Sequence, residues 1–203
     1  MFFIRQNKKE VTADVTEDTQ LIELAKANPA DFDLLYERYF ARIYNYCLRR
    51  LGQPKEAEHL TSLVFTRAFS GLAGYRGGSI AAWLFQIAHN AVINHLKAKK
   101  AQVSLEVAVS NGWLDNQTES GNPTLDRLLK LEEQALVSQL IEALPAEQRE
   151  LLTLSVVGGL TAREVGQILG KSEGAVWMAL HRIVQRLQKA YQKKSQVEVE
   201  VDR

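Results

Sequence analysis

The sequence has few of the residues that form disulfides and metal centres. It holds one cysteine, Cys47, which excludes an intramolecular disulfide and suits a reducing compartment. Its four histidines, His59, His89, His95 and His181, never stand at a ligand spacing with cysteine or carboxylate. We therefore expect no metal site.

Long apolar runs are also missing. No stretch approaches the roughly 20 apolar residues of a membrane span, so we expect no membrane association. The N-terminal "MFFIRQNKKE" places its basic residues after a short apolar run and has no small-residue cleavage site, which makes it a poor signal peptide. The sequence shows no paired acid and base, phosphate loop or metal cluster. We expect a cytoplasmic, non-enzymatic protein without a cofactor.

The net charge of +1 conceals an uneven distribution. Residues 29–100 carry ten Lys and Arg against five Asp and Glu, residues 101–130 carry two against four, and residues 131–194 carry eight against seven. A concentrated positive charge suits a polyanionic partner, although a solvated basic face is the common alternative.

The hydrophobic periodicity predicts an all-α fold. After a short helix in "DTQLIELAKA", spacings of three and four predict a helix over 31–51, closed by Gly52. Cys47 falls inside that pattern as a small buried hydrophobe. Pro54 opens the next helix at a first-turn position. Four glycines interrupt residues 71–79, and Ser79 can cap a long helix over 80–100.

A polar, acidic segment divides the chain into two helical domains. Residues 101–123 form the linker between a first domain at 29–100 and a second at 124–194. Residues 1–28 make an N-terminal extension with a short helix. Residues 195–203 are a tail whose "QVEVEVD" alternates perfectly; a frayed terminus is the plain interpretation, and pairing with a partner's sheet edge is the alternative.

The second domain contains a helix-turn-helix pattern. Thr161 and Glu164 form a capping box, Gly170 ends that helix, and Ser172 caps the next one. A small residue at Gly166 suits the close crossing of two helices. A tight helical hairpin without DNA is the alternative. The outward N-terminal end of the second helix, which meets base edges in such motifs, carries Glu173, Trp177, Met178 and His181.

Two polar faces could meet nucleic acid. Arg182, Arg186, Lys189 and Lys193 form a basic edge that could follow phosphates, or a face that only favours solubility. In the first domain Gln86, Asn90, Asn94 and Lys97 recur on one helix face, where amides can bond base edges. Tyr75 and Arg76 in the glycine loop offer stacking surfaces for an opened strand. A plain solvent face is the alternative, and Trp83 fits the core better than a platform.

The two halves together resemble the group IV, or extracytoplasmic-function (ECF), sigma factors of bacterial RNA polymerase. The resemblance rests on "FDLLYERYFARIYNYCLRRLGQPKEAEHLTSLVFTRAF", "YRGGSIAAWLFQIAHNAVINHLKAKK" and "LIEALPAEQRELLTLSVVGGLTAREVGQILGKSEGAVWMALHRIVQRL". It covers most of residues 30–190. It implies two small helical domains, sigma domain 2 and sigma domain 4, joined by a flexible linker.

The resemblance also implies partners and sites. Domain 2 would bind the β′ clamp helices of core RNA polymerase and the minus-ten element, and domain 4 the β flap and the minus-thirty-five element. An anti-sigma factor is a further expected partner. The minus-ten residues would be Tyr75, Arg76, Ser79, Gln86, Asn90, Asn94 and Lys97. The minus-thirty-five residues would be Ser172, Glu173, Trp177, Met178, His181, Arg182 and Arg186. The polymerase-facing residues would be Glu58, His59, Ser62 and Leu63.

The chain departs from the family pattern on these surfaces. Where the family usually reads "AEDLVQEVF" this chain reads "AEHLTSLVF", which removes charge at positions 59 and 63. The loop "YRGGSIAAWL" is one residue shorter than the usual "FRGESSFRTWL". Trp177 and Ala179 replace a usual Lys and Arg, so we expect the second helix to use backbone positioning, His181 and thymine methyls. A sigma-like regulator or adaptor that does not support initiation is the alternative function.

Overall fold

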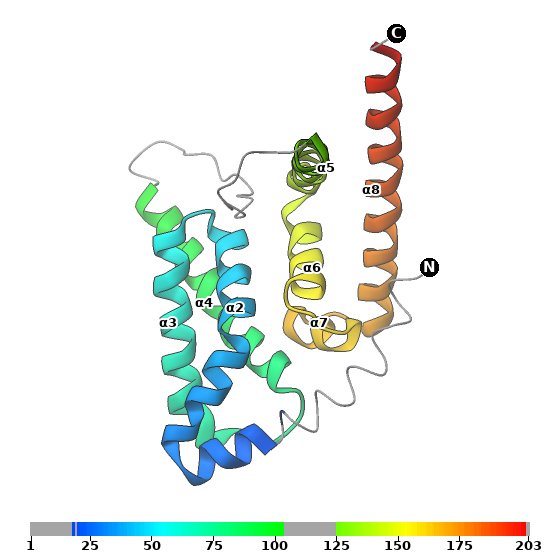
Figure 1. The fold of residues 1–203 in the computed structure, drawn as a ribbon. Coiled ribbons are helices and arrows are strands. Elements are labelled where there is room, and N and C mark those ends of the chain that lie inside the picture. Colours follow the sequence, from blue (N-terminus) through cyan, green and yellow to red (C-terminus); the bar gives the residue numbers. More distant parts are fainter. Residues whose placement is uncertain (1–17, 19, 104–124, 202–203) are drawn as a thin grey trace.

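The protein is all-helical in the part that its computed structural model describes, which confirms the predicted fold class. That part comprises residues 18, 20–103 and 125–201, with side chains described for residues 18, 20–100 and 134–194. Over these residues the chain forms no β-strand, and the helices gather into two groups (Figure 1).

The first group is a compact bundle. Residues 20–27 are helical, and a 3-10 turn η1 at Pro29–Asp31 leads into α2 at Phe32–Leu51. Gly52 closes α2 with φ 69°, a left-handed conformation that glycine adopts without strain. α3 then spans Pro54–Gly71, η2 spans Leu72–Gly74, and α4 spans Ile80–Val103. The predicted helices and their closing residues are confirmed.

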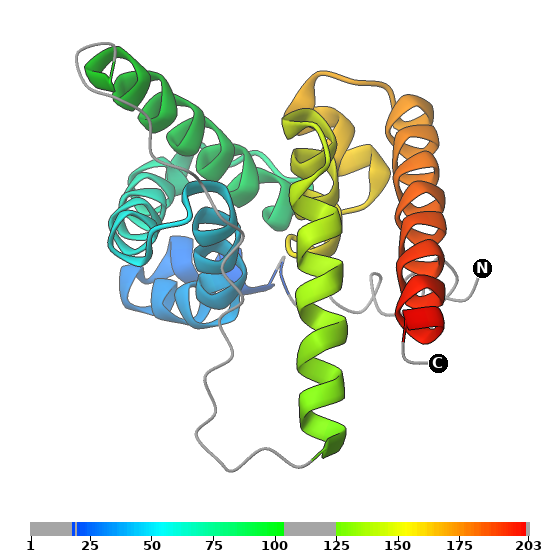
Figure 2. The same cartoon turned by 90° about the horizontal axis from the view of Figure 1, so that it is seen from above.

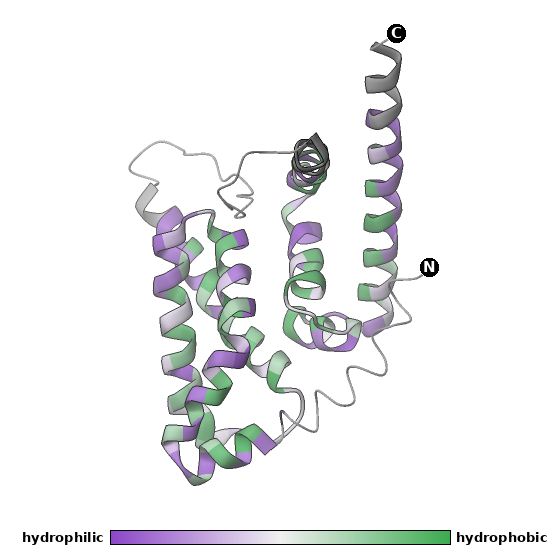
Figure 3. Cartoon of the chain, in the orientation of Figure 1, coloured by the Kyte–Doolittle hydropathy of each residue, from purple (hydrophilic) through white to green (hydrophobic). Residues whose placement is uncertain are grey.

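Burial follows the predicted apolar faces of this group. In α2 the side chains of Leu35, Tyr39, Ile43 and Tyr46 are at most 1% exposed. Hydrophobic and hydrophilic residues alternate around α2 and α3 in Figure 3, as expected for amphipathic helices that cover a shared core. Cys47 lies in that core, as predicted.

The second group contains α5 at Leu125–Glu142, α6 at Ala146–Val156, α7 at Ala162–Leu169 and α8 at Glu173–Val201. The bounds of α7 and the start of α8 agree with those predicted from the capping box, Gly170 and Ser172. The tail is different: α8 remains helical as far as Val201, so its alternating sequence is neither frayed at 195–201 nor a strand there. Most of the predicted linker lies outside the described residues, since α4 ends at Val103.

The two groups pack directly against each other. α7 contacts α4 as well as α8, and α6 contacts α2, as the two orthogonal views show (Figures 1 and 2). Buried residues of α2, α3, α4, α6, α7 and α8 belong to one continuous hydrophobic cluster. The linker composition predicted two domains, but it gave no sign that they share an interface.

None of the described helices carries an apolar stretch long enough to cross a lipid bilayer.

Candidate nucleic-acid and polymerase interfaces

The helix-turn-helix is held by local contacts that its sequence predicts. The Thr161 hydroxyl accepts a hydrogen bond from the Glu164 backbone N–H at 3.3 Å, and the Glu164 carboxylate accepts from the Thr161 N–H at 2.7 Å. Gly170 takes φ 65° at the end of α7, and the Ser172 hydroxyl accepts from the Ala175 N–H at 3.2 Å. The capping box and both caps are therefore confirmed.

Gly166 is the point of closest approach in this motif. A Cβ atom at that position would lie 2.6 Å from the backbone oxygen of Lys171, closer than packed atoms come. Val176, fully buried, anchors the start of α8 against the rest of the domain. Together these contacts fix the angle at which α8 leaves the turn.

The N-terminal end of α8 presents the predicted residues to solvent. Ser172, Glu173, Trp177, Met178, His181, Arg182 and Arg186 are all exposed. The Trp177 and His181 rings are stacked, with centroids 5.4 Å apart and planes within 2°. The Nε2 atom of His181 lies 2.9 Å from the Gln185 amide nitrogen, which orients the imidazole further. The structure thus combines an apolar patch with one oriented polar ring.

A basic edge continues along α8. Arg182, Arg186, Lys189 and Lys193 are exposed, while Val176 and Ile183, about a quarter-turn around the helix from the middle of that edge, are buried. This arrangement separates the packing face from the charged face, as predicted.

α4 carries the polar stripe of the first group. Asn90, Asn94 and Lys97 are exposed and Gln86 is half-buried, while Leu84, Ala91 and Val92 face the core. The Gln86 amide donates to the Asn90 side-chain oxygen at 3.2 Å, which aligns two members of the stripe. The stripe is therefore a continuous, solvent-facing row of amides that ends in a cation.

The glycine loop before α4 is organised around Tyr75. Its hydroxyl donates to the Gly78 carbonyl at 2.8 Å, and its ring lies against Trp83 with centroids 5.1 Å apart. Gly77 and Gly78 both adopt positive φ, 99° and 105°, which permits the tight reversal. Arg76 is exposed. The Ser79 hydroxyl accepts a hydrogen bond from the Ala82 N–H at 3.2 Å, so Ser79 is the N-cap of α4, as predicted.

Lys26 contacts this loop, which the sequence did not predict. Its ammonium donates to the Tyr75 carbonyl at 3.2 Å and lies 5.7 Å from the Tyr75 ring centroid. The N-terminal extension thereby supports the loop. Nothing in the sequence pattern linked the two positions, which are 49 residues apart.

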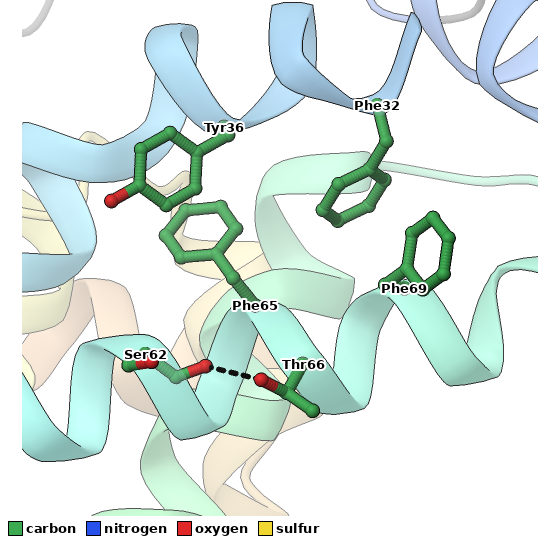
Figure 4. A pocket seen from close by; sticks show the side chains of 6 residues that line it. All are labelled: Phe32, Tyr36, Ser62, Phe65, Thr66 and Phe69. Carbon is green, nitrogen blue, oxygen red and sulfur yellow. Dashed lines mark hydrogen bonds between the residues drawn. The ribbon is translucent and has the colours of Figure 1, made fainter. Parts of the chain in front are cut away.

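The positions that we predict to face polymerase lie along α3. Glu58, His59 and Ser62 are exposed, whereas Leu63 is partly buried and packs on the hydrophobic core. Ser62 also borders a shallow apolar groove between α2 and α3, shown in Figure 4 and lined by Phe32, Tyr36, Ser62, Phe65, Thr66 and Phe69. Tyr36 is 40% exposed and Phe69 47%. A contiguous patch of exposed aromatic side chains is typical of a protein contact surface.

A buried polar cluster joins the two helical groups. Glu150, on α6, is 5% exposed. Its carboxylate accepts from the Tyr46 hydroxyl at 2.7 Å, lies 3.1 Å from the His89 Nδ1 atom and forms an ion pair with the Arg50 guanidinium. Tyr46 and Arg50 belong to α2 and His89 to α4, so all three partners come from the other helical group. We call these four residues the interdomain cluster.

Neighbouring contacts extend the cluster. The Arg42 guanidinium of α2 donates to the Gly158 carbonyl after α6 and stacks over the Tyr39 ring, 4.9 Å from its centroid. A Cβ atom at Gly158 would lie 3.1 Å from the Phe85 ring of α4. The interface is thus close-packed as well as charged.

The electrostatics of the cluster favour the ionised carboxylate. Burial by itself raises the pKa of Glu150, but the hydrogen bond from His89, the charge of Arg50 and the hydrogen bond from Tyr46 outweigh it. The net result is a pKa of the Glu150 carboxyl below its ordinary value of 4.5. Burial and the adjacent carboxylate raise the pKa of the Tyr46 hydroxyl well above 10.0, so it stays protonated and donates.

Comparison with known proteins places the two groups in one family. The family model described as Sigma-70 region 2 matches residues 35–102, and the one described as Sigma-70, region 4 matches residues 134–187. The chain is 32% identical over 178 residues to "ECF RNA polymerase sigma factor BldN" of Streptomyces coelicolor, covering 86% of this chain and 66% of that protein. It is 35% identical to "ECF RNA polymerase sigma factor ShbA" of Streptomyces griseus, covering 70% of this chain and 78% of that protein.

A solved structure shares the fold. It is the sigma factor RpoE in complex with the anti-sigma factor NepR from Bartonella quintana, with a TM-score of 0.63 and 18% identity, covering 80% of this chain and 97% of that one.

Proposed function

The chain belongs to the ECF sigma factors of the sigma-70 family, and we propose that its two helical groups divide promoter recognition between the residues described above. The protein is an alternative sigma factor that binds core RNA polymerase and directs transcription initiation at promoter DNA. One observation carries the residue-level proposal: the same chain exposes a row of amides on α4 and the N-terminal end of α8.

The minus-ten element is assigned to α4 and the glycine loop. Asn90 and Asn94 would bond the edges of unpaired bases, and Lys97 would neutralise a phosphate. Tyr75 and Arg76 provide faces for stacking. Ser79 serves this site by capping α4, which fixes the direction in which the stripe leaves the loop.

Replacing Asn90 or Asn94 with Ala tests this assignment. We expect slower and less complete promoter opening, measured by permanganate reactivity of unpaired thymines in the reconstituted holoenzyme, with core binding unchanged. Asn45→Ala is the matched control, because Asn45 is an exposed amide on α2 away from the stripe. Opening at the wild-type rate in both stripe variants would remove these residues from the site.

The minus-thirty-five element is assigned to α8. Trp177 and Met178 suit apolar contact with thymine methyls, and His181 can donate or accept at a base edge. Arg182 and Arg186 would hold the DNA backbone, which positions the helix without reading sequence.

Arg182→Ala tests the backbone contact. Duplex binding should weaken, and the slope of log affinity against log salt should fall by about one unit, because one fewer phosphate is neutralised. Arg67→Ala removes the same charge from an exposed position on α3 and should leave the slope unchanged. Equal slopes for Arg182→Ala and the wild type would show that this edge only faces solvent.

The polymerase contact is assigned to the exposed face of α3. Glu58, His59 and Ser62 would meet the β′ clamp helices, with the aromatic groove beside Ser62 supplying apolar contact area. The second helical group would meet the β flap. The loss of charged residues on this face lowers electrostatic steering more than it lowers contact area, so slow association with core polymerase is expected.

A sigma-like regulator or adaptor that does not support initiation is the second candidate, and the altered α3 face favours it. Reconstitution with cognate core polymerase, followed by promoter-melting and runoff-transcription assays on duplex promoter DNA, separates the two. A holoenzyme that starts transcription supports the sigma factor function, and DNA binding without any holoenzyme supports the adaptor.

The remaining assignments follow from the family. Sigma factors act by binding, and we propose no catalytic step, cofactor or metal for this chain. We place it in the cytoplasm, where its proposed polymerase partner works. An anti-sigma factor is a further proposed partner, by analogy with the complex of RpoE and NepR.

A further inference from the structure

We propose that Lys171, in the turn between α7 and α8, is a further phosphate-binding residue for duplex DNA, and that Glu147 on α6 competes with the DNA for it. Neither residue belongs to the sites assigned above. The inference rests on the proposed minus-thirty-five function of α8, because the turn approaches DNA only if that helix does. Phosphate contacts do not depend on base sequence, so the pair influences how strongly the chain holds any duplex.

Lys171 and Glu147 form an ion pair on the surface of the second helical group. The Lys171 ammonium lies 2.6 Å from the Oε1 atom of Glu147, and the two side chains are 37% and 69% exposed. α6 packs against both α7 and α8, which brings a residue of its first turn to the turn of the helix-turn-helix. The hydrogen bond from Lys171 and its charge lower the pKa of the Glu147 carboxyl below its ordinary 4.5, so both partners are charged at neutral pH.

The backbone of Lys171 is fixed at the end of the motif that is expected to face DNA. It directly precedes Ser172, the N-cap of α8, and its N–H donates to the Gly166 carbonyl at 2.9 Å. In helix-turn-helix proteins the N-terminal end of the second helix enters the major groove, beside the phosphates that border it. The flexible four-carbon stem of a lysine lets its ammonium exchange a carboxylate for a phosphate oxygen there.

The carboxylate of Glu147 opposes this exchange in two ways. While the pair is formed, Lys171 adds no net positive charge to the surface, and when the pair breaks, an anion is left beside the DNA. Glu173, in the exposed first turn of α8, places a second carboxylate two residues from Lys171. The surface around the turn is therefore less positive than the edge farther along α8 that carries Arg182 and Arg186.

The exposure of the pair makes the competition reversible. Exposed ion pairs contribute little to stability, because water screens the attraction and both side chains lose freedom. A phosphate can therefore displace Glu147 without disturbing the core. Because the pair weakens a contact that carries no sequence information, base-edge contacts such as those proposed for Trp177 and His181 make up a larger share of the binding free energy.

Salt-dependent duplex binding by the full chain tests the competition. The probe is a fluorescein-labelled duplex of mixed sequence, about 25 base pairs long so that it spans more than two helical turns. Its binding is followed by fluorescence anisotropy between about 0.05 and 0.2 M salt. Glu147→Gln removes the competing charge and Lys171→Gln removes the cation. Glu37→Gln and Lys55→Gln are matched controls, because they make the same charge changes at exposed positions on α2 and α3.

We expect Glu147→Gln to bind the duplex about fivefold to tenfold more tightly than the wild type at about 0.1 M salt, because Lys171 then neutralises one phosphate. The slope of log affinity against log salt should steepen by about one unit. Glu37→Gln should match the wild type in both quantities. An unchanged slope in Glu147→Gln, or an equal gain in Glu37→Gln, would overturn the proposal.

A double-mutant cycle identifies the cation that Glu147 holds. In the wild type, Lys171→Gln should change the slope little, because its charge is already paired. In the Glu147→Gln background the same change should return the slope to the wild-type value, whereas Lys55→Gln should leave it steep. Equal effects of Lys171→Gln in the two backgrounds would contradict the competition. Circular dichroism should show the wild-type helix content in every variant, since all the substituted positions are exposed.

Arg182→Ala, measured with the same probe, separates this inference from the proposed function. Unchanged affinity and slope in Arg182→Ala would count against the minus-thirty-five assignment, while the response of Glu147→Gln would still decide the competition. A lower slope in Arg182→Ala together with no gain in Glu147→Gln would leave the proposed function standing and show that Lys171 is not a competed phosphate contact.

Discussion

At the scale of single residues, the chemistry of this protein is governed by burial. Glu150 remains an anion inside the molecule because three donors surround it. Cys47 has no such support: burial raises the pKa of its thiol to about 12. Trp177, by contrast, keeps 47% of its surface exposed, a large apolar side chain left at the position where the family usually carries a cation. Each of these residues takes its properties from its surroundings rather than from its type.

The buried thiol gives a direct prediction. At pH 8 a thiol with a pKa of about 12 is ionised in about one molecule in ten thousand, and burial keeps a disulfide reagent away from the little thiolate that forms. Native protein should therefore react with a disulfide reagent such as Ellman's reagent at least a hundredfold more slowly than the same protein in denaturant. Rapid reaction of the native chain would place Cys47 outside the core.

Lys26 also acts at this scale. It holds the Tyr75 carbonyl from a position outside the family-matched segment, which starts at residue 35. The N-terminal extension therefore adds one contact to a glycine loop that Tyr75 also holds through Gly78 and Trp83. A variant at this position would act on the loop through Tyr75, whose carbonyl and ring the ammonium contacts.

At the scale of elements, the helix-turn-helix shows how strongly a short segment can be specified. The capping box, the left-handed glycine and the Ser172 cap were all predicted from residues 161–172, and every one is present. Their interactions are local, within four residues of each other, so sequence patterns encode them completely. The α4 stripe is equally local in origin, because helical periodicity alone places its members on one face.

Gly166 provides the prediction at this scale. Gly166→Ala would put a Cβ atom 2.6 Å from the Lys171 backbone oxygen. Because that oxygen belongs to the backbone of the tight turn, it cannot easily move away. Overpacking of this kind costs about 1–3 kcal/mol of folding free energy and should also weaken binding of the minus-thirty-five duplex. Urea denaturation followed by circular dichroism measures the first effect, and fluorescence anisotropy the second.

Gly174→Ala is the control for that measurement. A Cβ atom there meets nothing within 4 Å, and alanine is the better helix former. This variant should be as stable as the wild type or up to about 1 kcal/mol more stable. Equal stability losses in both variants would mean that the crossing at Gly166 is not tight.

At the scale of the whole molecule, the decisive feature is the interface between the two helical groups. It places a charged cluster and a close-packed contact between distant segments: His89 and Glu150 are 61 residues apart in the sequence, and Arg42 and Gly158 are 116 apart. The positions of α4 and α8 relative to each other are therefore set by contacts between the two helical groups.

The interface predicts a response to pH. The pKa of the Glu150 carboxyl is lowered in the folded protein, so ionised Glu150 stabilises the packed arrangement of the two groups. That contribution is complete above the ordinary pKa of 4.5 and is lost as the pH falls through the lower pKa of the folded state. The difference in free energy of unfolding between the wild type and Glu150→Gln, measured by urea denaturation, should therefore stay constant down to about pH 5 and decrease below it.

Glu150→Gln isolates that response. It removes the ionisable group, so its free energy of unfolding should lack the component that the wild type loses in acid. Glu56, whose pKa is also lowered, by Lys99 and His95, remains in both proteins and lies within one helical group. Its titration affects the stability of that group and serves as an internal reference. Identical acid profiles for the two proteins would exclude Glu150 as the group responsible.

The sequence by itself determined the helices, their caps, the helix-turn-helix and the exposed rows of α4 and α8, because each depends on residues within one or two turns of each other. It also indicated the sigma-70 family, which the family models and relatives confirm. Only the tertiary structure brought Glu150 to Tyr46, Arg50 and His89, Lys26 to Tyr75, and α7 against α4. Those contacts join distant segments through individual side chains, and no local periodicity encodes which buried charge will meet which partner.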